Sequence, residues 1–207
     1  TIAISSTTTG VSDGSTTSDA TIALTFTTSA STTDFVVGDI TATNGTLSSF
    51  TGSGTSYTAT FTPTGPGACT IDVAADKFTD GASNDNTASD QFNWTFDNVA
   101  PTVTNVTSTK ANGTYSIGEV IGITITFSEV VNVTGTPQIT LETGGTDAVV
   151  DYSSGTGNST LTFNYTVAAG HTSADLDYVA TSSLALNSGT IKDATNNNAT
   201  LTLPAIG

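Results

Sequence analysis

Residues 21–27 read TIALTFT, and residues 121–127 read IGITITF. Apolar and polar side chains alternate along both stretches, and this period of two residues is typical of a β-strand with one buried face. The same alternation recurs in SYTATFT (56–62), QFNWTF (91–96) and TLTFNYT (160–166). No stretch shows the 3.6-residue period of an amphipathic helix. The sequence therefore predicts an all-β protein.

Glycine-containing turn sequences separate these strands at short intervals. They fall at residues 44–45, 52–54, 144–145 and 155–157. A rhythm of short strands and tight turns is typical of two antiparallel sheets packed face to face. We therefore expect a β-sandwich architecture.

The chain reads as two similar halves joined near residues 97–101, DNVAP. Proline cannot donate a backbone hydrogen bond, so Pro101 blocks a continuous strand through the junction. The opening residues 1–5, TIAIS, match the start of the second half at residues 102–106, TVTNV. We predict two tandem sandwiches, residues 1–98 and 99–207, whose short linker favours a stiff rod.

The composition limits the classes of partner. Hydrophobic residues make up 36% of the chain and charged residues 10%, with a formal net charge of -15. The three basic residues are Lys77, Lys110 and Lys192, and arginine is absent. Nucleic acid and anionic membranes need a basic surface and are therefore excluded as partners. Two interpretations of the acidic excess stay open: a divalent cation as counter-ion, or an acidic surface that maintains solubility.

Single residues and absent residue types add smaller points. Cys69 has no partner for an intrachain disulfide and lies in a strand-like segment, so we predict a buried small side chain. Methionine is absent, which favours a mature or excised chain. No stretch is long and apolar enough to insert into a membrane. The Thr-rich, charge-poor composition favours an extracellular location.

Several segments resemble the bacterial immunoglobulin-like or cadherin-like repeats of large secreted surface adhesins. In the second half they are FSEVV (127–131), VTGTPQITL (133–141) and ADLDY (174–178). In the first half they are FVVGDI (35–40) and DNVAPT (97–102). The resemblance implies two tandem immunoglobulin-like antiparallel β-sandwiches that serve as stalks, spacers or binding modules.

Calcium is the cofactor that this resemblance and the acidic excess favour. It takes six to eight oxygen ligands, which loops at one end of a sandwich can supply. The principal candidates are Glu129, Asp177 and Asp193. The remaining candidates are Glu119 and Asp175, then Asp97 and Asn98 from the linker, and Asp80 and Asp85 in the first half. The first half reads Phe26-Thr27-Thr28 where the second reads Phe127-Ser128-Glu129, so it lacks one candidate carboxylate.

The loop at residues 80–86, DGASNDN, has two interpretations. Its composition resembles a calcium loop, but it lacks the spacing of an EF-hand and a terminal bidentate glutamate. The alternative is an Asx-rich turn in which Asp and Asn side chains bond the backbone.

Other polar and aromatic residues carry further hypotheses. Trp94 lies in an alternating strand and is predicted to be a core residue, with a sugar-stacking platform as the alternative. His171 is the one histidine, and we expect it in a surface turn rather than in a catalytic triad. Asn-x-Thr sequons for glycosylation occur at Asn44, Asn93, Asn105, Asn112, Asn132, Asn158, Asn164 and Asn198.

The sequence favours a structural and adhesive extracellular module over an enzyme. The first interpretation is part of a rod-like adhesin stalk, stiffened by calcium, whose partners are neighbouring repeats and a surface glycan or protein receptor. The second is a subunit of an extracellular filament, pilus or surface layer, in which copies of the chain exchange β-strands. The third is a carbohydrate-binding module.

Overall fold

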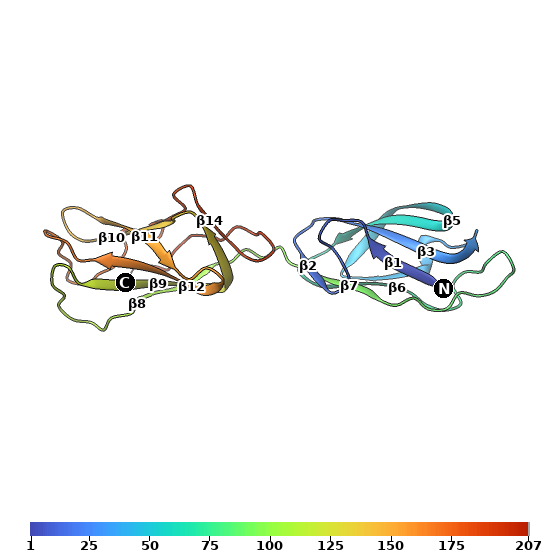
Figure 1. The fold of residues 1–207 in the computed structure, drawn as a ribbon, viewed down its shortest axis with the longest axis horizontal. Coiled ribbons are helices and arrows are strands. Elements are labelled where there is room, and N and C mark those ends of the chain that lie inside the picture. The colour runs from blue at the N-terminus through green and yellow to red at the C-terminus, as the bar shows by residue number, and fades with distance from the viewer. Residues whose placement is uncertain (207) are drawn as a thin grey trace. The chain divides into compact units, whose positions relative to one another are not determined.

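The computed structural model describes residues 1–206, which form two compact units. The first unit is Thr1–Val99, and the second begins at Ala100. Figure 1 shows the first unit in blue to green and the second in green to red. Apart from one short 3-10 helix, the regular structure consists of β-strands. The prediction of an all-β fold is confirmed. Among residues 1–206, no helix is long and apolar enough to cross a bilayer.

The first unit packs two sheets against each other. One sheet has the strand order β1-β3-β5, and the other has the order β2-β7-β6-β4, with β2 parallel to β7. A 3-10 helix, η1 (Val37–Asp39), precedes β4. The strands are β1 (Ile2–Ser6), β2 (Ser15–Thr17), β3 (Ile22–Thr32), β4 (Ile40–Thr43), β5 (Gly45–Pro63), β6 (Gly67–Val73) and β7 (Phe92–Phe96).

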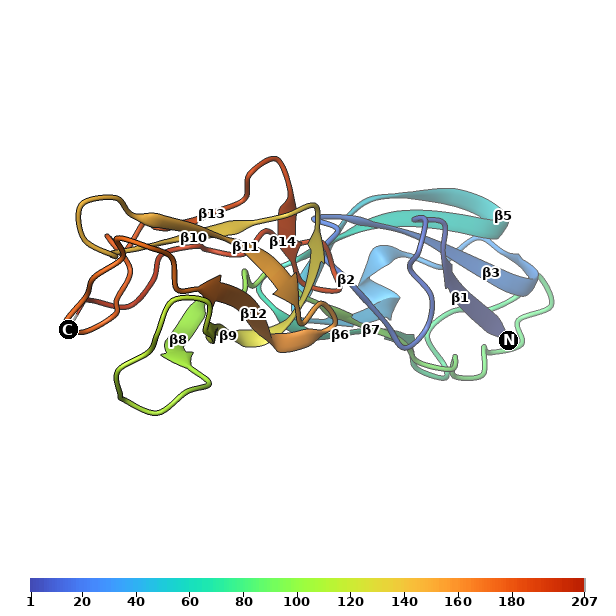
Figure 2. The same ribbon diagram turned by 60° about the vertical axis from the view of Figure 1, so that its left-hand side comes forward.

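Strand β5 is long because it turns back on itself at Gly52 and Gly54. A Cβ atom built on Gly45 would lie 2.1 Å from Phe61 Cζ, and one on Gly52 would lie 2.3 Å from the Ser56 carbonyl oxygen. The two ends of the strand are therefore in close contact, and only glycine fits at these positions. Figure 2 shows the resulting pair of cyan strands at the β5 label.

The core of the first unit follows the alternation seen in the sequence. Leu24 and Phe26 on β3 are buried, whereas Thr27, the next residue along the same strand, is exposed. Trp94 is 2% exposed, and its ring packs edge-on against Phe61 with centroids 4.8 Å apart. Cys69 is fully buried, and burial raises the pKa of its thiol. The core predictions for Trp94 and Cys69 agree with these placements.

The second unit repeats the sandwich with less regular strands. Its strand order is β13-β10-β11-β12-β9-β14, and β8 also pairs with β9. The long strand β9 pairs with β8 and β12 in its first part and with β14 near its end. The strands are β8 (Val103–Ser108), β9 (Val120–Thr134), β10 (Gln138–Leu141), β11 (Ala148–Ser154), β12 (Asn158–Thr166), β13 (Leu184–Ala185) and β14 (Thr190–Lys192).

The core of the second unit contains more aliphatic and fewer aromatic side chains than that of the first. Ile125 pairs with Leu161, and Ile123 with Phe163, across β9 and β12, and all four side chains are buried. Ile139, Leu141 and Ile191 cover them from the other side of the same cluster. The alternation in residues 121–127 thus places one face of β9 in the core, as predicted from the sequence.

Candidate functional site: a carboxylate pair beside the entry of the second unit

Asp193 begins a tight loop immediately after β14. Its Oδ1 accepts backbone N–H bonds from Thr195 at 2.9 Å and Asn197 at 2.8 Å. Its Oδ2 accepts a bond from the Asn197 side-chain amide at 2.8 Å, and the Asp193 N–H bonds back to the Asn197 carbonyl at 3.1 Å. The side chain of Asp193 is 4% exposed. The loop therefore holds a carboxylate at a fixed, largely buried position.

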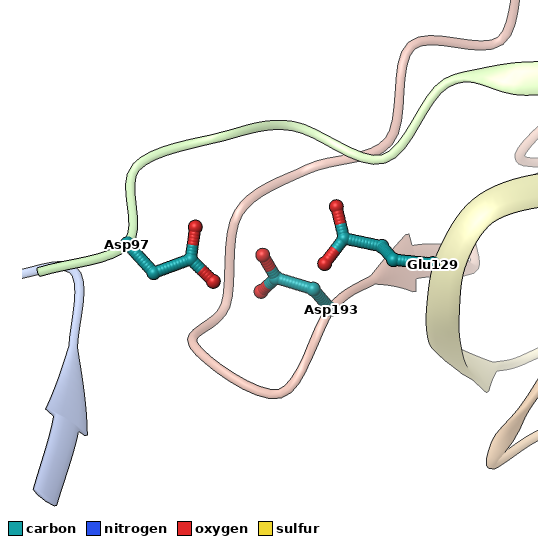
Figure 3. Close-up of side chains that lie close together, drawn as sticks. All are labelled: Asp97, Glu129 and Asp193. Carbon is teal, nitrogen blue, oxygen red and sulfur yellow. The ribbon is translucent and has the colours of Figure 1, made fainter. Parts of the chain in front are cut away.

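Glu129 places a second carboxylate next to the first. It lies on β9 just after the stretch that pairs with β8, and it is half-buried. One carboxylate oxygen of Glu129 and one of Asp193 lie within 4.8 Å of each other. Figure 3 shows these two side chains, together with Asp97 from the linker. At an effective dielectric constant of 20, two unit charges at this separation repel by about 3 kcal/mol.

The chain enters the second unit directly beside this pair. Thr102 and Ser128 exchange two bonds, from Ser128 N to the Thr102 carbonyl at 2.8 Å and from Thr102 N to Ser128 Oγ at 3.0 Å. The Pro101 carbonyl accepts a bond from Thr200 N at 2.8 Å. The first residues of the second unit are therefore held beside Ser128, the residue that precedes Glu129 on β9.

The first unit contains the same loop at Asp80. Asp80 Oδ1 accepts N–H bonds from Ala82 at 2.8 Å and Asn84 at 3.0 Å, and the Asn84 amide donates to Oδ2 at 2.9 Å. The Asp80 N–H bonds to the Asn84 carbonyl at 3.0 Å, as in the other loop. An Asp-x-x-x-Asn spacing in both halves of the sequence was the signal for this repeat, and the sequence analysis missed it.

The surroundings of the Asp80 loop are those of an Asx-rich turn. Asn86 is 5% exposed, and its Oδ1 accepts the N–H bonds of Lys77 at 2.7 Å and Phe78 at 3.0 Å. Asp85 is exposed and lies opposite Thr79 in an isolated β-bridge. The Asn86 side chain thus bonds the backbone of this turn, and Asp85 takes part through its backbone.

Asp34 reinforces this end of the first unit. Its carboxylate accepts bonds from the Thr32 hydroxyl at 2.6 Å and from the Thr79 hydroxyl at 2.9 Å, and from the Thr79 N–H at 3.0 Å. These donors, the Thr32 hydroxyl first, lower the pKa of Asp34 below its usual value. The Asn84 side chain and neighbouring N–H groups lower the pKa of Asp80 in the same way.

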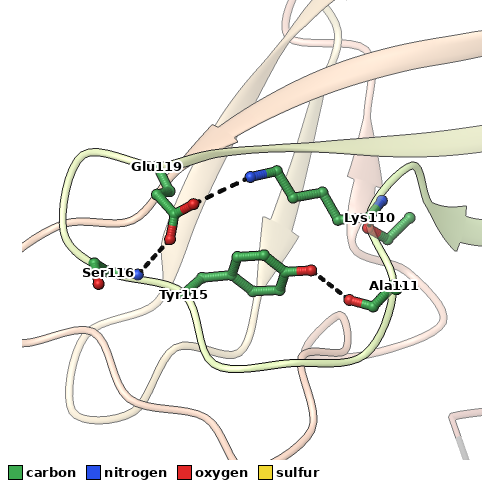
Figure 4. A network of polar contacts seen from close by, with 6 residues as sticks. Lys110, Ala111, Tyr115, Ser116 and Glu119 are labelled. Carbon is green, nitrogen blue, oxygen red and sulfur yellow. Dashed lines mark hydrogen bonds and ion pairs between the residues drawn. The ribbon is translucent and has the colours of Figure 1, made fainter.

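The other predicted ligands of the second unit lie elsewhere in that unit. Glu119 accepts a bond from Ser116 N at 2.7 Å and pairs with Lys110 Nζ at 3.3 Å, and these donors lower its pKa (Figure 4). Lys110 also lies 4.8 Å from the centre of the Tyr115 ring, and the Tyr115 hydroxyl donates to the Ala111 carbonyl. Glu119 therefore holds the loop between β8 and β9.

Asp175 and Asp177 line an open groove of about 1420 Å³ in the second unit. The Asp177 carboxylate accepts the Tyr178 N–H at 2.8 Å. His171 lies in the same groove, stacked on Tyr165, and its Nδ1 is 2.9 Å from the Tyr165 hydroxyl oxygen. Asp177 is therefore outside the group formed by Glu129 and Asp193.

The eight sequons differ between the two units. Asn44 and Asn93 are half-buried, and their side-chain amides donate to Gly65 O at 2.8 Å and to Asp13 Oδ1 at 2.9 Å. The six sequon asparagines of the second unit are exposed: Asn105, Asn112, Asn132, Asn158, Asn164 and Asn198. The side-chain nitrogens of Asn44 and Asn93 are thus engaged within the fold.

The two-layered first unit has the architecture of an immunoglobulin-like sandwich, with β1 in one sheet and β2 parallel to the last strand of the other. Residues 2–96, nearly the whole of the first unit, match the family model of a bacterial Ig-like domain, and this match is consistent with bacterial immunoglobulin-like repeats. The family is generally non-enzymatic and typically extracellular. Searches of curated proteins and of solved structures return no match to the chain.

Proposed function

We propose that this protein is an extracellular structural module, part of a rod-like surface adhesin stalk, and that a calcium ion stiffens the junction between its repeats. The observation that carries the proposal is the buried Asp193 carboxylate with Glu129 beside it, next to the point where the linker enters the second unit. The family of the first unit supports the structural and extracellular role.

The donor set of this site fits calcium. Ca²⁺ binds oxygen ligands at 2.3–2.6 Å, so two ligand oxygens of one ion are at most roughly 5 Å apart. The Glu129 and Asp193 oxygens satisfy that limit. Calcium requires six to eight oxygens, and in this proposal Asp97 and Asn98 of the linker, backbone carbonyls and water would supply the rest. A bound cation would also remove the repulsion between the two carboxylates.

Such a site has a mechanical consequence. A ligand taken from the linker and two from the second unit would restrict the rotation of residues 97–101. A five-residue linker with a proline already has few accessible conformations. Calcium would therefore convert a short linker into a rigid joint, which is the property that a stalk requires.

The two alternative functions, a carbohydrate-binding module and a strand-exchanging filament, each need a particular structural feature. A carbohydrate-binding module needs an exposed aromatic platform, but the predicted candidate, Trp94, is 2% exposed and packs in the core. Strand exchange in a filament needs an open sheet edge. In the first unit, the half of β5 before the turn at Gly52 carries Ser49 with a positive φ of 52°, a distortion that opposes pairing along that edge.

Thermal unfolding of the whole chain tests the proposal, with calcium or chelator, while light scattering follows assembly at two protein concentrations. Calcium at about 100 times its Kd should stabilise the second unit by about 2.7 kcal/mol. Glu129→Gln should lose most of this gain, yet in chelator it should be at least as stable as the wild type because the repulsion is gone. Glu142→Gln is the matched control, since Glu142 is exposed and its carboxylate accepts the N–H of the nearby Gly144 at 2.9 Å.

Two results contradict the proposal. One is a wild-type unfolding midpoint that calcium does not change. The other is an equal calcium response in the Glu129→Gln and Glu142→Gln variants. Concentration-dependent assembly without any calcium response would support the strand-exchanging filament instead.

A further inference from the structure

The charges of this protein are segregated from its sheets. Three of its 18 acidic residues, Asp72, Glu129 and Asp151, lie in the described strands, and the others lie outside them, with Asp39 at the end of η1. Strands β1, β3 and β5, which form one sheet of the first unit, contain no charged residue along their described lengths. A chain with a net charge of -15 thus has one entire sheet that is neutral.

The outward face of this sheet is made of small hydroxyl and methyl groups in register. One cross-strand row is Ala3, Thr27 and Ser56, and the next is Ser5, Thr25 and Thr58. Burial alternates along β3, so the threonines between Leu24, Phe26 and the next core position point away from the core. We call these two rows the threonine face.

The same chemistry recurs in the second unit on the corresponding strands. Thr124 pairs with Thr162 and Thr126 with Thr160 across β9 and β12, and the hydroxyl oxygens of Thr126 and Thr160 are 3.3 Å apart. All four side chains are half-buried on the face opposite the core residues Ile125 and Leu161. Paired threonines on a sheet face therefore occur in both repeats, but only the first has a sheet without charge, since β9 and β11 carry Glu129 and Asp151.

We propose that the threonine face is a self-association surface whose partner is the threonine face of a second copy of this chain. Two acidic copies repel each other wherever their loops meet, and the repulsion is smallest where charge is absent. A hydroxyl both donates and accepts hydrogen bonds, so a face of threonines is complementary to itself and needs no opposite charge. Such a contact can be isologous, with the same face on both copies.

The size of the face limits the strength of the contact. The threonine face is part of the outward face of the whole sheet. Because β5 turns back on itself, that outward face has four strand segments about 4.8 Å apart, each about six residues long with a rise of 3.4 Å, and covers roughly 400 Å². Stable complexes bury about 800 Å² per partner, so one pair of repeats should associate weakly. Many repeats aligned side by side would add their contacts, and avidity would then hold parallel stalks together.

Sedimentation equilibrium of the full chain in chelator tests this proposal independently of the calcium site. The average mass should rise with protein concentration towards about 1 mM, more at about 0.5 M NaCl than at about 0.05 M, because salt screens the repulsion between the acidic loops. The double variant Thr25→Glu with Thr58→Glu places two charges on paired positions of the face and should weaken association at least about tenfold.

Thr16→Glu with Thr95→Glu is the matched control. These exposed residues are also cross-strand partners, but they lie in the other sheet, and the variant adds the same two charges. Its association should stay near that of the wild type. Trp94 fluorescence confirms that each variant is folded, and Ser5→Glu on the edge strand β1 replaces the double variant if that one does not fold.

Three results overturn the proposal. The first is a wild type that stays monomeric at about 1 mM and high salt. The second is an equal loss of association in both double variants. The third is that the threonine-face variant changes only the retention of the chain on a neutral polysaccharide column, which would assign the face to a glycan.

Discussion

The loops at residues 80–84 and 193–197 form the same hydrogen bonds in two different settings. In each, an aspartate accepts the N–H groups of the second and fourth following residues, and the asparagine at the fourth position bonds its carboxylate. Asp80 is half-buried, whereas Asp193 is 4% exposed. Local sequence therefore determines the loop, and tertiary neighbours determine what its carboxylate can do.

The neighbour that differs between the two units is the residue two positions after Phe26 in the first and two positions after Phe127 in the second. In the second unit it is Glu129, within 4.8 Å of Asp193. In the first it is Thr28, which is 4% exposed and donates its hydroxyl to the Ala30 carbonyl at 2.8 Å. An acidic loop alone is thus a structural turn, and the second carboxylate makes it a candidate metal site.

The largest expected effect comes from removing the aspartate of each loop. Asp193→Ala should destabilise the second unit by about 2–3 kcal/mol, because the part-buried N–H groups of Thr195 and Asn197 lose a charged, largely buried acceptor. Asp80→Ala should destabilise the first unit by less, because water can replace the carboxylate at a more exposed loop. Urea unfolding in chelator measures both, with Trp94 fluorescence for the first unit and amide hydrogen exchange for the second.

Equal losses of stability in the two variants would contradict the difference in burial between the loops. Thr87→Ala is a suitable control in the first unit, since Thr87 is exposed and should change the unfolding free energy by less than about 0.5 kcal/mol.

Much of the fold could be predicted from the sequence because the strands obey a local rule. The alternation in residues 21–27 and 121–127 assigns each side chain to the core or the surface, and the burial of Leu24, Phe26 and Ile125 agrees with it. The turn of β5 back on itself at Gly52 was harder to predict from the sequence. Its turn glycines were recognised, but the closeness of Gly45 to Phe61 is a long-range contact. Short strands of the second unit, such as β13, show no comparable periodicity in the sequence.

The candidate site was only partly predictable. Glu129 and Asp193 were chosen by residue type and resemblance, and they lie together. Asp177 was predicted with them on the same grounds, but it lies in the groove. The sequence could not show this difference, because no local pattern states which loops share an end of the sandwich. Asn197 was missed because its role depends on an i+4 bond that composition does not reveal.

Acid should weaken the first unit through Asp34 and Asp80. Their hydrogen-bond donors lower the pKa of both carboxyl groups in the folded state. A lowered pKa means stability that is present above the unfolded-state pKa and lost as pH falls, so the loss should begin below about pH 4. The urea midpoint followed by Trp94 fluorescence between about pH 2 and 6 measures it. Asp34→Asn with Asp80→Asn should flatten the acid limb, and an unchanged slope would assign the loss to other groups.

The smallest effect tests whether the two loops are equivalent in their backbones. The residue before the loop asparagine has a positive φ in both, 61° at Ser83 and 71° at Asn196. Asparagine tolerates this left-handed conformation better than serine does. Ser83→Asn should therefore stabilise the first unit by a few tenths of a kcal/mol (about 0.3), and the reciprocal Asn196→Ser should destabilise the second by a similar amount. Urea unfolding should give free-energy changes of opposite sign in the two single variants. The double swap should give the sum of the two changes, because each residue acts only on its own loop. Shifts of the same sign would mean that side-chain contacts outside the loops, rather than the shared backbone conformation, select the residue at this position.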